Sequence, residues 1–358
     1  MEGIKGKVNP YFWKDKKVFL TGHTGFKGSW LSLWLQSMGA VVKGYSLAPP
    51  THPSLFLVAD VAKNMESQLG DIRDLEQLKE SMLAFDPAIL IHMAAQPLVR
   101  LSYIEPVDTY TTNVIGTVNV LEAARNCPNL KAIVSVTTDK CYENKEWAWG
   151  YRENEPMGGH DPYSSSKGCA ELVSSAYKNS FFNTKDSAAL ATARAGNVIG
   201  GGDWADDRLI PDILKAFENS KSVIVRNPLS TRPWQHVLEP LSGYLVLAEH
   251  LYTYGQEYAE AWNFGPKEED CKPVNWILDK MVATWGAGAG WELDKNSHPH
   301  EAGFLKLDCS KAALKLHWHP RWNLEHTLSL IVNWHQDWRA GKNINEKCLQ
   351  EIANYSNS

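Results

Sequence analysis

Two short stretches of the sequence combine side chains that can move protons. The first is TTDK, at positions 137–140, which directly follows the apolar run AIVSV. The second is YSSSK, in which Tyr163 and Lys167 are four residues apart. On a helix this spacing places both side chains on one face. A lysine beside a tyrosine, with the positive charge of a nicotinamide close by, favours the phenolate and lowers the tyrosine pKa, so Tyr163 could take a proton from an alcohol.

Both stretches also have ordinary structural explanations. The spacing Tyr-x-x-x-Lys is common by itself and often marks a solvated pair on a helix. Neighbouring Asp139 and Lys140 are compatible with a surface ion pair, which contributes little to stability. The chemical interpretation therefore depends on other elements that bring the two stretches together.

A third stretch, GHTGFKG, places Gly22, Gly25 and Gly28 between an expected strand and an expected helix. Glycines at such a turn let the backbone turn tightly, approach a pyrophosphate closely and pack the helix on the sheet. The helix N-terminus then offers free N–H groups to the phosphates. A glycine triad alone is a weak signal, because a tight turn also explains it. Its place at the first strand-to-helix turn predicts dinucleotide binding.

The residues leave the choice between NAD and NADP open. The second expected strand ends near Ser46, where an NAD enzyme usually has an acid that binds the ribose hydroxyls. Ser46 can form hydrogen bonds but does not repel a 2′-phosphate. Asp71 and Ile72 follow the next short strand and could border the adenine, although Asp71 could equally cap a helix.

The order of elements predicts an α/β protein with a Rossmann-type doubly wound parallel sheet. Apolar runs predict strands at 16–22, 40–47, 88–95 and 131–138, and helical periodicity predicts helices at 29–39, 72–85, 111–126 and 161–179. The last of these would begin with Asp161 at its cap and Pro162 in its first turn. No hairpin signals interrupt the alternation, so the sheet should be covered on both faces. Ligands of such sheets lie at the carboxyl ends of the strands, where TTDK is placed.

The second half of the chain has a different composition. From about Gly200 the pattern loosens into loops rich in Gly, Pro and Trp, with helices expected at 208–219, 239–254 and 274–285. We therefore predict a dinucleotide-binding domain over residues 1–195. A smaller α/β domain over residues 196–358 would bind the substrate, with some of its segments returning to the first domain.

Composition excludes several other classes of protein. The chain has 358 residues, 44% of them hydrophobic and 22% charged, and a net charge of -5, which gives no reason to expect nucleic acid or an anionic membrane as partner. No apolar run approaches the roughly 18 residues that span a bilayer. Six scattered cysteines without a C-x-x-C pair favour reduced thiols in the cytoplasm. The HPH and HWHP runs lack ligands that would complete a zinc site, so no metal is predicted.

With these motifs in place, the chain resembles the extended short-chain dehydrogenases/reductases, and within them the nucleotide-sugar 4,6-dehydratases. The resemblance covers nearly the whole chain and rests on GHTGFKG, HMAAQ, TNVIGT, TTDK, YSSSK, ARAGNVIGGGDW, RPWQHV and HEAGFLKLDCSKA. Family members typically carry Thr-Asp-Glu where this chain has Thr138-Asp139-Lys140. That departure, with NVIGGGDW and RPWQHV, is similar to the branch that acts on CDP-D-glucose.

The resemblance implies an oxidation, an elimination and a reduction on one sugar. Tightly bound NAD would oxidise the hexose at C4, water would leave across C5 and C6, and C6 would then be reduced. Tyr163 would act as base for the C4 alcohol with Thr138 sharing its hydrogen bond, and a protonated Asp139 would act as acid for the C6 hydroxyl. Lys140 would either remove the C5 proton or stay charged and stabilise the enolate oxygen, and the sequence does not choose between these roles.

The resemblance also implies binding residues and an assembly. The residues expected at the cofactor are Gly22, Thr24, Gly25, Phe26, Lys27, Gly28, Ser46, Asp71, Ile72, Ala94, Ala95, Gln96, Asn113, Thr137, Tyr163 and Lys167. Those expected at the nucleotide sugar are Gln96, Arg100, Asn197, Arg208, Leu209, Ile210, Arg226, Arg232, Trp234 and Glu301. Helices near 108–126 and 162–179 would pair across a two-fold axis into a homodimer or a homotetramer.

Two other functions fit parts of this pattern. A nucleotide-sugar 4-epimerase shares the fold, the cofactor and the Tyr-Lys pair, but should lack the acid at Asp139. A dinucleotide-binding regulatory protein without activity would not need Thr138, Asp139, Tyr163 and Lys167 together.

Overall fold

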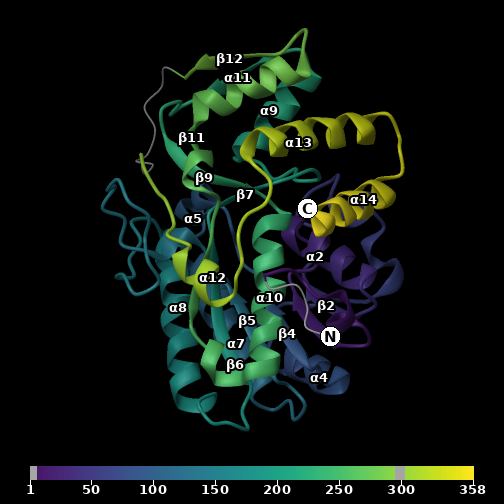
Figure 1. The fold of residues 1–358 in the computed structure, drawn as a ribbon, viewed down its shortest axis with the longest axis vertical. Coiled ribbons are helices and arrows are strands. Elements are labelled where there is room, and N and C mark those ends of the chain that lie inside the picture. Colours follow the sequence, from purple (N-terminus) through teal and green to yellow (C-terminus); the bar gives the residue numbers. More distant parts are fainter. Residues whose placement is uncertain (1–5, 295–302) are drawn as a thin grey trace.

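The computed structural model describes residues 6–294 and 303–358, and at its centre is a sheet of seven strands (Figure 1). The strand order is β10-β6-β5-β4-β1-β2-β3, and every neighbouring pair is parallel. The strands are β1 (Lys17–Thr21), β2 (Val41–Ser46), β3 (Glu66–Leu69), β4 (Ile89–His92), β5 (Ala132–Val136), β6 (Ala189–Ala195) and β10 (Ala261–Phe264). The predicted doubly wound parallel sheet is confirmed.

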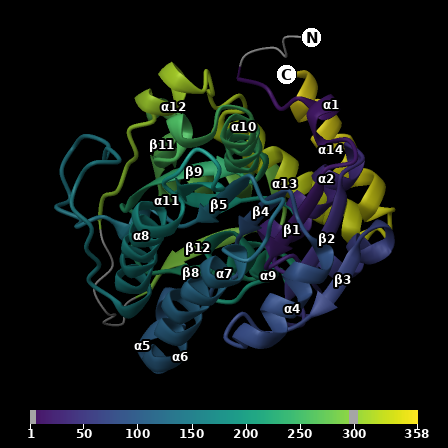
Figure 2. The same cartoon turned by 90° about the horizontal axis from the view of Figure 1, so that it is seen from below.

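Alternate side chains of each strand enter two separate cores, which explains why the strands read as continuous apolar runs. Val18 and Leu20 pack into one core, and Phe19 between them packs into the other. The first core is covered by α2 (Phe26–Ser37), α10 (Leu238–Tyr254), α12 (Ser310–Lys315) and α14 (Ile344–Asn357). The second is covered by α4 (Leu75–Phe85), α7 (Gly116–Ala124) and α8 (Pro162–Phe181), as the view from below shows (Figure 2).

The helix predicted at 111–126 begins earlier than expected. Helical structure starts at α6 (Pro106–Tyr110) and passes through a π-helical turn (Thr111–Ile115) into α7. Pro106 suits a first helical turn because its missing N–H needs no partner there. The α8 prediction is confirmed, since Asp161 accepts a hydrogen bond from the Ser164 amide at 2.9 Å.

A second, smaller lobe follows β6 in the chain and lies at the top of Figure 1. It holds a three-stranded sheet, β7 (Asn197–Ile199), β9 (Thr231–His236) and β11 (Cys271–Pro273), and a strand pair, β8 (Ser222–Val225) and β12 (Gly290–Leu293). Its helices are α9 (Leu209–Glu218), α11 (Val274–Trp285) and α13 (Leu324–Arg339). Between these elements, α10 and β10 return to the large sheet. The boundary after residue 195 stays a prediction.

The remaining helices are short. They are α1 (Pro10–Trp13), α3 (Leu55–Val58) and α5 (Val99–Ile104). In the described parts of the chain, every helix is too short or too polar to cross a bilayer.

Candidate active site

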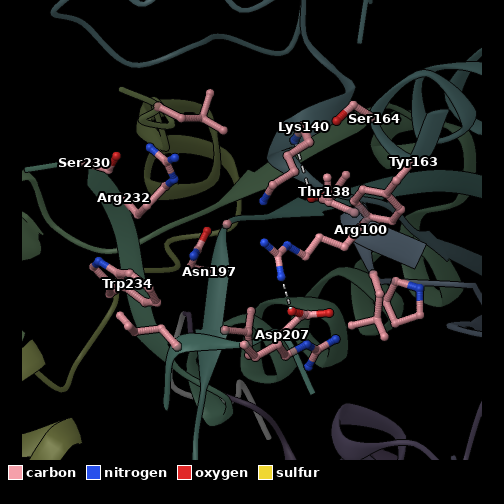
Figure 3. A pocket seen from close by; sticks show the side chains of 18 of the residues that line it. Arg100, Thr138, Lys140, Tyr163, Ser164, Asn197, Asp207, Ser230, Arg232 and Trp234 are labelled. Atoms are coloured by element: carbon pink, nitrogen blue, oxygen red, sulfur yellow. Dashed lines mark hydrogen bonds and ion pairs between the residues drawn. The ribbon is translucent and has the colours of Figure 1, made fainter. Parts of the chain in front are cut away.

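A cleft of about 910 Å³ opens at the carboxyl end of β5 and is lined by residues of both lobes (Figure 3). One wall comes from the end of β5, the start of α8 and α5. The other comes from β7, β9 and the start of α9. The predicted site residues that line it are Lys27, Arg100, Thr137, Thr138, Lys140, Tyr163, Asn197, Arg208, Leu209, Ile210, Arg226, Arg232 and Trp234.

Thr138, Asp139 and Lys140 form a short turn directly after β5. The Thr138 hydroxyl donates a hydrogen bond to Asp139 Oδ1 at 2.9 Å, and Lys140 Nζ lies 3.8 Å from the same oxygen. Asp139 is fully buried, and its Oδ2 has no hydrogen-bond partner among the described residues. A Cβ on Gly196, which lines the cleft, would lie 3.1 Å from that Oδ2. Asp139 and Lys140 are therefore not the solvated surface pair of the alternative explanation.

Tyr163 and Lys167 lie one turn apart on α8, and both are buried. Burial raises the pKa of Tyr163 to about 12, while a hydrogen bond with Thr138 lowers it. Burial also lowers the pKa of Lys167 to about 8, and its Nζ lies 3.5 Å from the carbonyl oxygen of Val136. Desolvation of the phenolate is the largest cause of the raised tyrosine pKa in the chain by itself. The expectation that Lys167 and a bound nicotinamide together lower this pKa stays a prediction.

Lys27, in the glycine loop, contacts a residue that is distant in the sequence. Its Nζ donates to the Tyr244 hydroxyl at 3.3 Å. The pKa of Lys27 is lowered to about 7, first by burial and then by the charges of Lys167 and Arg208, while Asp139 acts in the opposite direction. Tyr244 lies on α10, far along the chain, so no local pattern could have indicated this contact.

The loop between β1 and α2 fits a dinucleotide. Gly22 has a φ of 79°, and a Cβ there would lie 2.8 Å from the Ala94 amide nitrogen. A Cβ on Gly28 would lie 2.0 Å from the Gly22 carbonyl oxygen. Gly25 occupies the N-cap position of α2, which begins at Phe26, so the first amides of that helix are available to phosphates. Thr24 Oγ1 lies 2.8 Å from Ser46 Oγ, which ties this loop to the end of β2.

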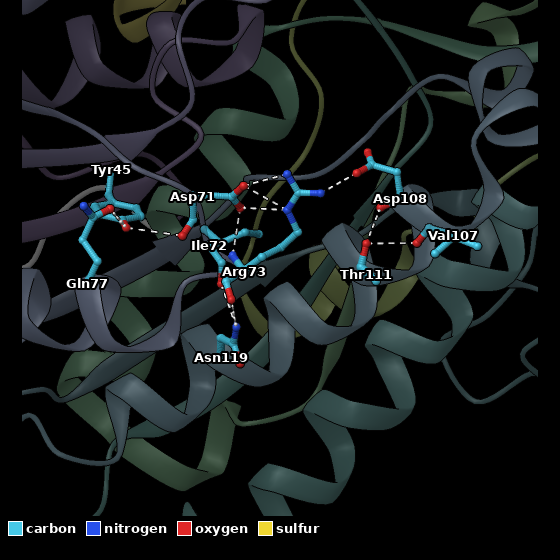
Figure 4. Close-up of polar contacts among 9 residues, drawn as sticks. All are labelled: Tyr45, Asp71, Ile72, Arg73, Gln77, Val107, Asp108, Thr111 and Asn119. Atoms are coloured by element: carbon cyan, nitrogen blue, oxygen red, sulfur yellow. Dashed lines mark hydrogen bonds and ion pairs between the residues drawn. The ribbon is translucent and has the colours of Figure 1, made fainter.

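Asp71, which is expected near the adenine, forms an ion pair with Arg73 (Figure 4). Its carboxylate accepts from the amide and the side chain of Arg73, whose guanidinium also pairs with Asp108. Arg73 lowers the pKa of Asp71 through these hydrogen bonds. Ile72 is buried beside them, and Asn119 donates to its carbonyl oxygen at 3.0 Å.

The segment after β4 contains Ala94, Ala95 and Gln96. Two hydrogen bonds join Gln96 to Asn113 in the π-helical turn. The Gln96 amide donates to Asn113 Oδ1 at 2.8 Å, and Asn113 Nδ2 donates back to the Gln96 carbonyl at 3.0 Å. The Gln96 side chain donates to Thr109 at 2.9 Å and does not line the cleft. The side chain of Gln96, which was expected at the nucleotide sugar, is therefore held inside the protein and away from the cleft.

Arginines form much of the wall opposite the triplet. Arg208 caps α9 and donates to Asp203 at 2.9 Å, and Arg232 lies on β9 beside Trp234 (Figure 3). Asn197 pairs with Trp234 in register, and its side-chain Oδ1 lacks a hydrogen-bond partner among the described residues.

Arg100 reaches across the cleft from α5 and donates to Asp207 at 2.8 Å. The acids that pair with the arginines, Asp203 and Asp207, were missed. Asp203 belongs to the quoted run NVIGGGDW, but nothing in that run indicates an arginine partner, and Asp207 lies in the polar stretch after it. Glu301 and His298–His300 lie outside the described residues.

Comparisons with known proteins agree with this geometry. The family model described as GDP-mannose 4,6 dehydratase matches residues 19–331. A CDP-glucose 4,6-dehydratase of Salmonella typhimurium is 61% identical over 352 residues, which are 97% of this chain and 98% of that protein.

Solved structures share the fold at lower identity. The dTDP-glucose 4,6-dehydratase of Bacillus anthracis in complex with NAD has a TM-score of 0.75 at 21% identity, covering 91% of this chain and 98% of its own. The UDP-glucose 4-epimerase of Thermotoga maritima with UDP-glucose has a TM-score of 0.78 at 20% identity, covering 90% and 99%. The fold therefore fits dehydratases and epimerases alike. The match of the family model over most of the sequence shows that this chain belongs to the GDP-mannose 4,6-dehydratase family, within the extended short-chain dehydrogenases/reductases.

Proposed function

We propose that this chain is a CDP-glucose 4,6-dehydratase, an NAD-dependent lyase that converts CDP-D-glucose into CDP-4-keto-6-deoxy-D-glucose and water. The supporting observation is the end of β5, where Thr138, Lys140 and Tyr163 line a wide cleft and the buried carboxyl of Asp139 lies directly behind them. An epimerase needs only the tyrosine, whereas loss of the C6 hydroxyl needs an acid as well. The identity with the Salmonella enzyme supports cytosine as the base of the nucleotide.

The cofactor fits the loop after β1. The backbone of Gly22–Gly28 would hold its pyrophosphate, Ser46, Asp71 and Ile72 would lie toward its adenosine, and Lys167 toward its nicotinamide ribose. When bound, NAD supplies what no side chain can, since it accepts a hydride from C4 and returns it to C6, so that none is consumed overall.

The side chains move the protons of the reaction. Tyr163 takes the proton of the C4 hydroxyl. Burial raises its pKa in the chain by itself, and the positive charge of a bound nicotinamide would act in the opposite direction. The resulting ketone acidifies the C5 hydrogen, and Lys140, which lines the cleft, either removes this proton or stays charged and stabilises the enolate oxygen. Asp139 donates a proton to the C6 hydroxyl, which leaves as water. A proton then returns to C5, and transfer of a proton from Tyr163 to Asp139 through solvent restores both groups, so substrate and product differ only by one water.

The orphaned oxygen of Asp139 supports its role as an acid. A buried carboxylate oxygen without a hydrogen bond is costly, whereas a protonated carboxyl can donate to a substrate hydroxyl. The opposite wall suits the diphosphate, because the planar guanidinium groups of Arg208 and Arg232 can each hold two phosphate oxygens.

Conversion of CDP-glucose tests the proposal directly. The purified chain, incubated with CDP-glucose and NAD, should give a 4-keto-6-deoxy product whose alkaline treatment produces a near-ultraviolet absorbance. Formation of a C4 epimer without that absorbance would assign the chain to the epimerases. Binding of NAD without any product would support the regulatory alternative. UDP-glucose and dTDP-glucose at equal concentrations test the choice of nucleotide.

We propose in addition that the chain forms a homodimer or a homotetramer through α6, α7 and α8. Large apolar side chains are exposed along these helices and the neighbouring α5: Ile104 (72% exposed), Val107 (75%), Ile115 (50%) and Leu172 (61%). All of these elements pack against one another on one side of the large sheet (Figure 2). A second copy of the same helices would cover them, because a two-fold interface buries the same patch on both subunits.

Light scattering at micromolar concentration should therefore report at least a dimer. The double variant Val107→Asp/Leu172→Glu should reduce the mass to that of a monomer. Leu314→Glu, on the equally exposed side chain of α12 (77% exposed), is the matched control and should leave the mass unchanged. A monomeric wild type would contradict the assembly proposal.

The place of the reaction in the cell follows from its chemistry and stays part of the proposal. Nucleotide sugars are made in the cytoplasm, and all six cysteines are free thiols, as suits that compartment. The product would enter 6-deoxy- or 3,6-dideoxy-sugar biosynthesis, such as that of lipopolysaccharide O-antigen.

A further inference from the structure

A buried ion pair lies directly beneath the end of β5. Glu171 on α8 and Arg194 on β6 are almost fully buried. The Arg194 guanidinium donates a hydrogen bond to each oxygen of the Glu171 carboxylate, from Nε to Oε1 at 2.9 Å and from Nη2 to Oε2 at 2.8 Å. The carboxylate also accepts from the hydroxyls of Thr137 and of Thr192, the latter at 2.8 Å. Each of its oxygens therefore accepts two hydrogen bonds. The mechanism above does not use this pair.

The pair holds the chain on both sides of the catalytic triplet. Thr137, which donates to Glu171, immediately precedes Thr138. Tyr142, which follows two residues after Lys140, accepts from Arg194 Nη1 at 2.7 Å. Tyr142 in turn donates to Asn263 at 2.7 Å and is fully buried. The turn that carries Asp139 and Lys140 is thus anchored at both ends to one ion pair.

The same pair connects the triplet to the Tyr-Lys pair. Glu171 lies one helical turn after Lys167 on α8, so the helix that carries Tyr163 and Lys167 also carries the carboxylate that holds the triplet. Burial alone would lower the pKa of Lys167, and Glu171 acts in the opposite direction. The carboxylate itself stays ionised, because Arg194 and the two hydroxyls outweigh the effect of its burial on the pKa.

We propose that Glu171 and Arg194 are positioning residues, which fix the acid–base triplet at the end of β5 against Tyr163 and Lys167 on α8. This inference rests on the proposed dehydratase function, in which Tyr163 serves the oxidation and Asp139 and Lys140 serve the elimination. The two reactions must act on one sugar without its release, so the distance between the two groups of side chains matters. Displacement by about 1 Å can reduce a rate roughly 100-fold.

The alternative is that Glu171 and Arg194 only stabilise the fold. Variants of the two threonines that donate to Glu171 can distinguish this structural role from a positioning role. Thr137 and Thr192 are both buried and both donate to the same carboxylate, but Thr137 adjoins the triplet whereas Thr192 lies inside β6. Valine has nearly the shape of threonine without the hydroxyl. Thr137→Val and Thr192→Val should therefore remove equivalent hydrogen bonds and lower Tm by similar amounts.

The experiment gives each variant CDP-glucose and follows both the 4-keto-6-deoxy product and the absorbance of the reduced nicotinamide. At a saturating NAD concentration, which removes any effect of Thr137 on cofactor affinity, Thr137→Val should lower kcat roughly 10- to 100-fold with the KM for CDP-glucose little changed, because a loosened triplet slows elimination after oxidation. Reduced nicotinamide should accumulate on the enzyme. Thr192→Val should keep wild-type kcat and show no accumulation. Thr137→Ser, which restores the hydroxyl, should recover the wild-type behaviour.

Other results would overturn the inference. Equal losses in the two valine variants would show that the pair only stabilises the fold, and wild-type kcat in both would show that the triplet needs no such anchor. A wild-type chain that forms no product from CDP-glucose would instead overturn the proposed function, and the inference with it. Glu171→Gln, which keeps the shape but removes the charge, is expected to show the Thr137→Val behaviour more strongly.

Discussion

The two walls of the cleft are built on different physical principles. At the end of β5 the Asp139 and Tyr163 side chains are buried and Lys140 is partly exposed. The ion pair of Glu171 and Arg194 beneath them is fully hydrogen-bonded within the chain. The opposite wall carries the partly exposed Arg208 with its partner Asp203, and its Asp207 accepts from Arg100, which reaches across from α5. One wall is fixed before a substrate arrives, and the other can exchange an internal carboxylate for a phosphate.

This difference predicts how substitutions should divide between kcat and KM. Groups that act only on the reacting atoms lower kcat when removed, whereas groups that hold the substrate equally well before and during reaction raise KM. Variants at the end of β5 should therefore affect kcat, and variants of the arginine wall should affect KM.

The largest effect is expected at the first proton transfer. Tyr163→Phe removes the base for the C4 alcohol and should reduce turnover about 10²–10⁴-fold, the usual contribution of a positioned acid or base. NAD should still bind. Lys167→Ala is the comparison, since it should impair both turnover and NAD binding. Steady-state kinetics and NAD titration measure the two effects, and near-normal turnover by Tyr163→Phe would place the base elsewhere.

A large but later block is expected at Asp139. Asp139→Asn keeps the shape but has no ionisable proton for the C6 hydroxyl, whereas oxidation at C4 depends on Tyr163. The variant should therefore accumulate reduced nicotinamide and the 4-keto hexose when given CDP-glucose, with turnover reduced on the order of 10²-fold. Absorbance of the reduced nicotinamide checks this, and wild-type turnover would remove Asp139 from the mechanism.

The companion variant Lys140→Met distinguishes the two roles of the lysine. If Lys140 is the C5 base or holds the enolate, exchange of the C5 hydrogen with deuterated water should stop together with elimination. Exchange that persists while elimination stops would assign Lys140 to a later step. Mass spectrometry of recovered substrate and product measures the exchange.

The sequence predicted the elements of the first wall better than their connections. The Asp161 cap of α8 follows from a local signal, namely a capping side chain before proline. The π-helical turn was missed because the pattern of that segment is also that of an ordinary helix. The ion pair of Glu171 and Arg194 joins residues on separate elements, and no local pattern reports such a contact.

The second wall was harder to predict for the same reason. The arginines were identified by resemblance, but their partners Asp203 and Asp207 come from a loop without periodicity. Gln96 illustrates the opposite error, since its place after β4 suggested a ligand while its amide is occupied by Thr109. Sequence position indicates which end of the sheet a residue approaches, but the packing of distant elements determines what its side chain contacts.

A moderate effect on substrate binding is expected at Arg232. Hydrogen bonds to charged groups contribute about 1.5–3 kcal/mol, so Arg232→Met should raise KM roughly 10- to 100-fold with kcat within a few-fold. Lys272→Met is the matched control, because Lys272 pairs with Arg232 in register on β11 but does not line the cleft. Initial rates at varied CDP-glucose give both constants, and an unchanged KM in Arg232→Met would exclude this arginine from diphosphate binding.

The smallest effect is expected at the pair that spans the cleft, Arg100 and Asp207. Their side chains are 40% and 43% exposed, and exposed pairs are worth about 0.2–1 kcal/mol, so Asp207→Asn should hardly change Tm. It should lower KM about two- to five-fold, because Arg100 no longer has to leave a carboxylate before it meets a phosphate. The gain should fade at high salt, which screens the pair in the wild type.

Asp206→Asn is the control that distinguishes loss of the Arg100–Asp207 ion pair from a change in net charge. Asp206 directly precedes Asp207 and carries the same charge, but it pairs with Lys215. Kinetics at low and high salt compare the two variants. A lower KM in Asp207→Asn alone would show that this wall works by exchanging a carboxylate for the substrate. An equal fall in both would mean that the loop only repels the substrate through its net charge. The contrast between a fixed wall and an exchangeable one would then not extend to Arg100.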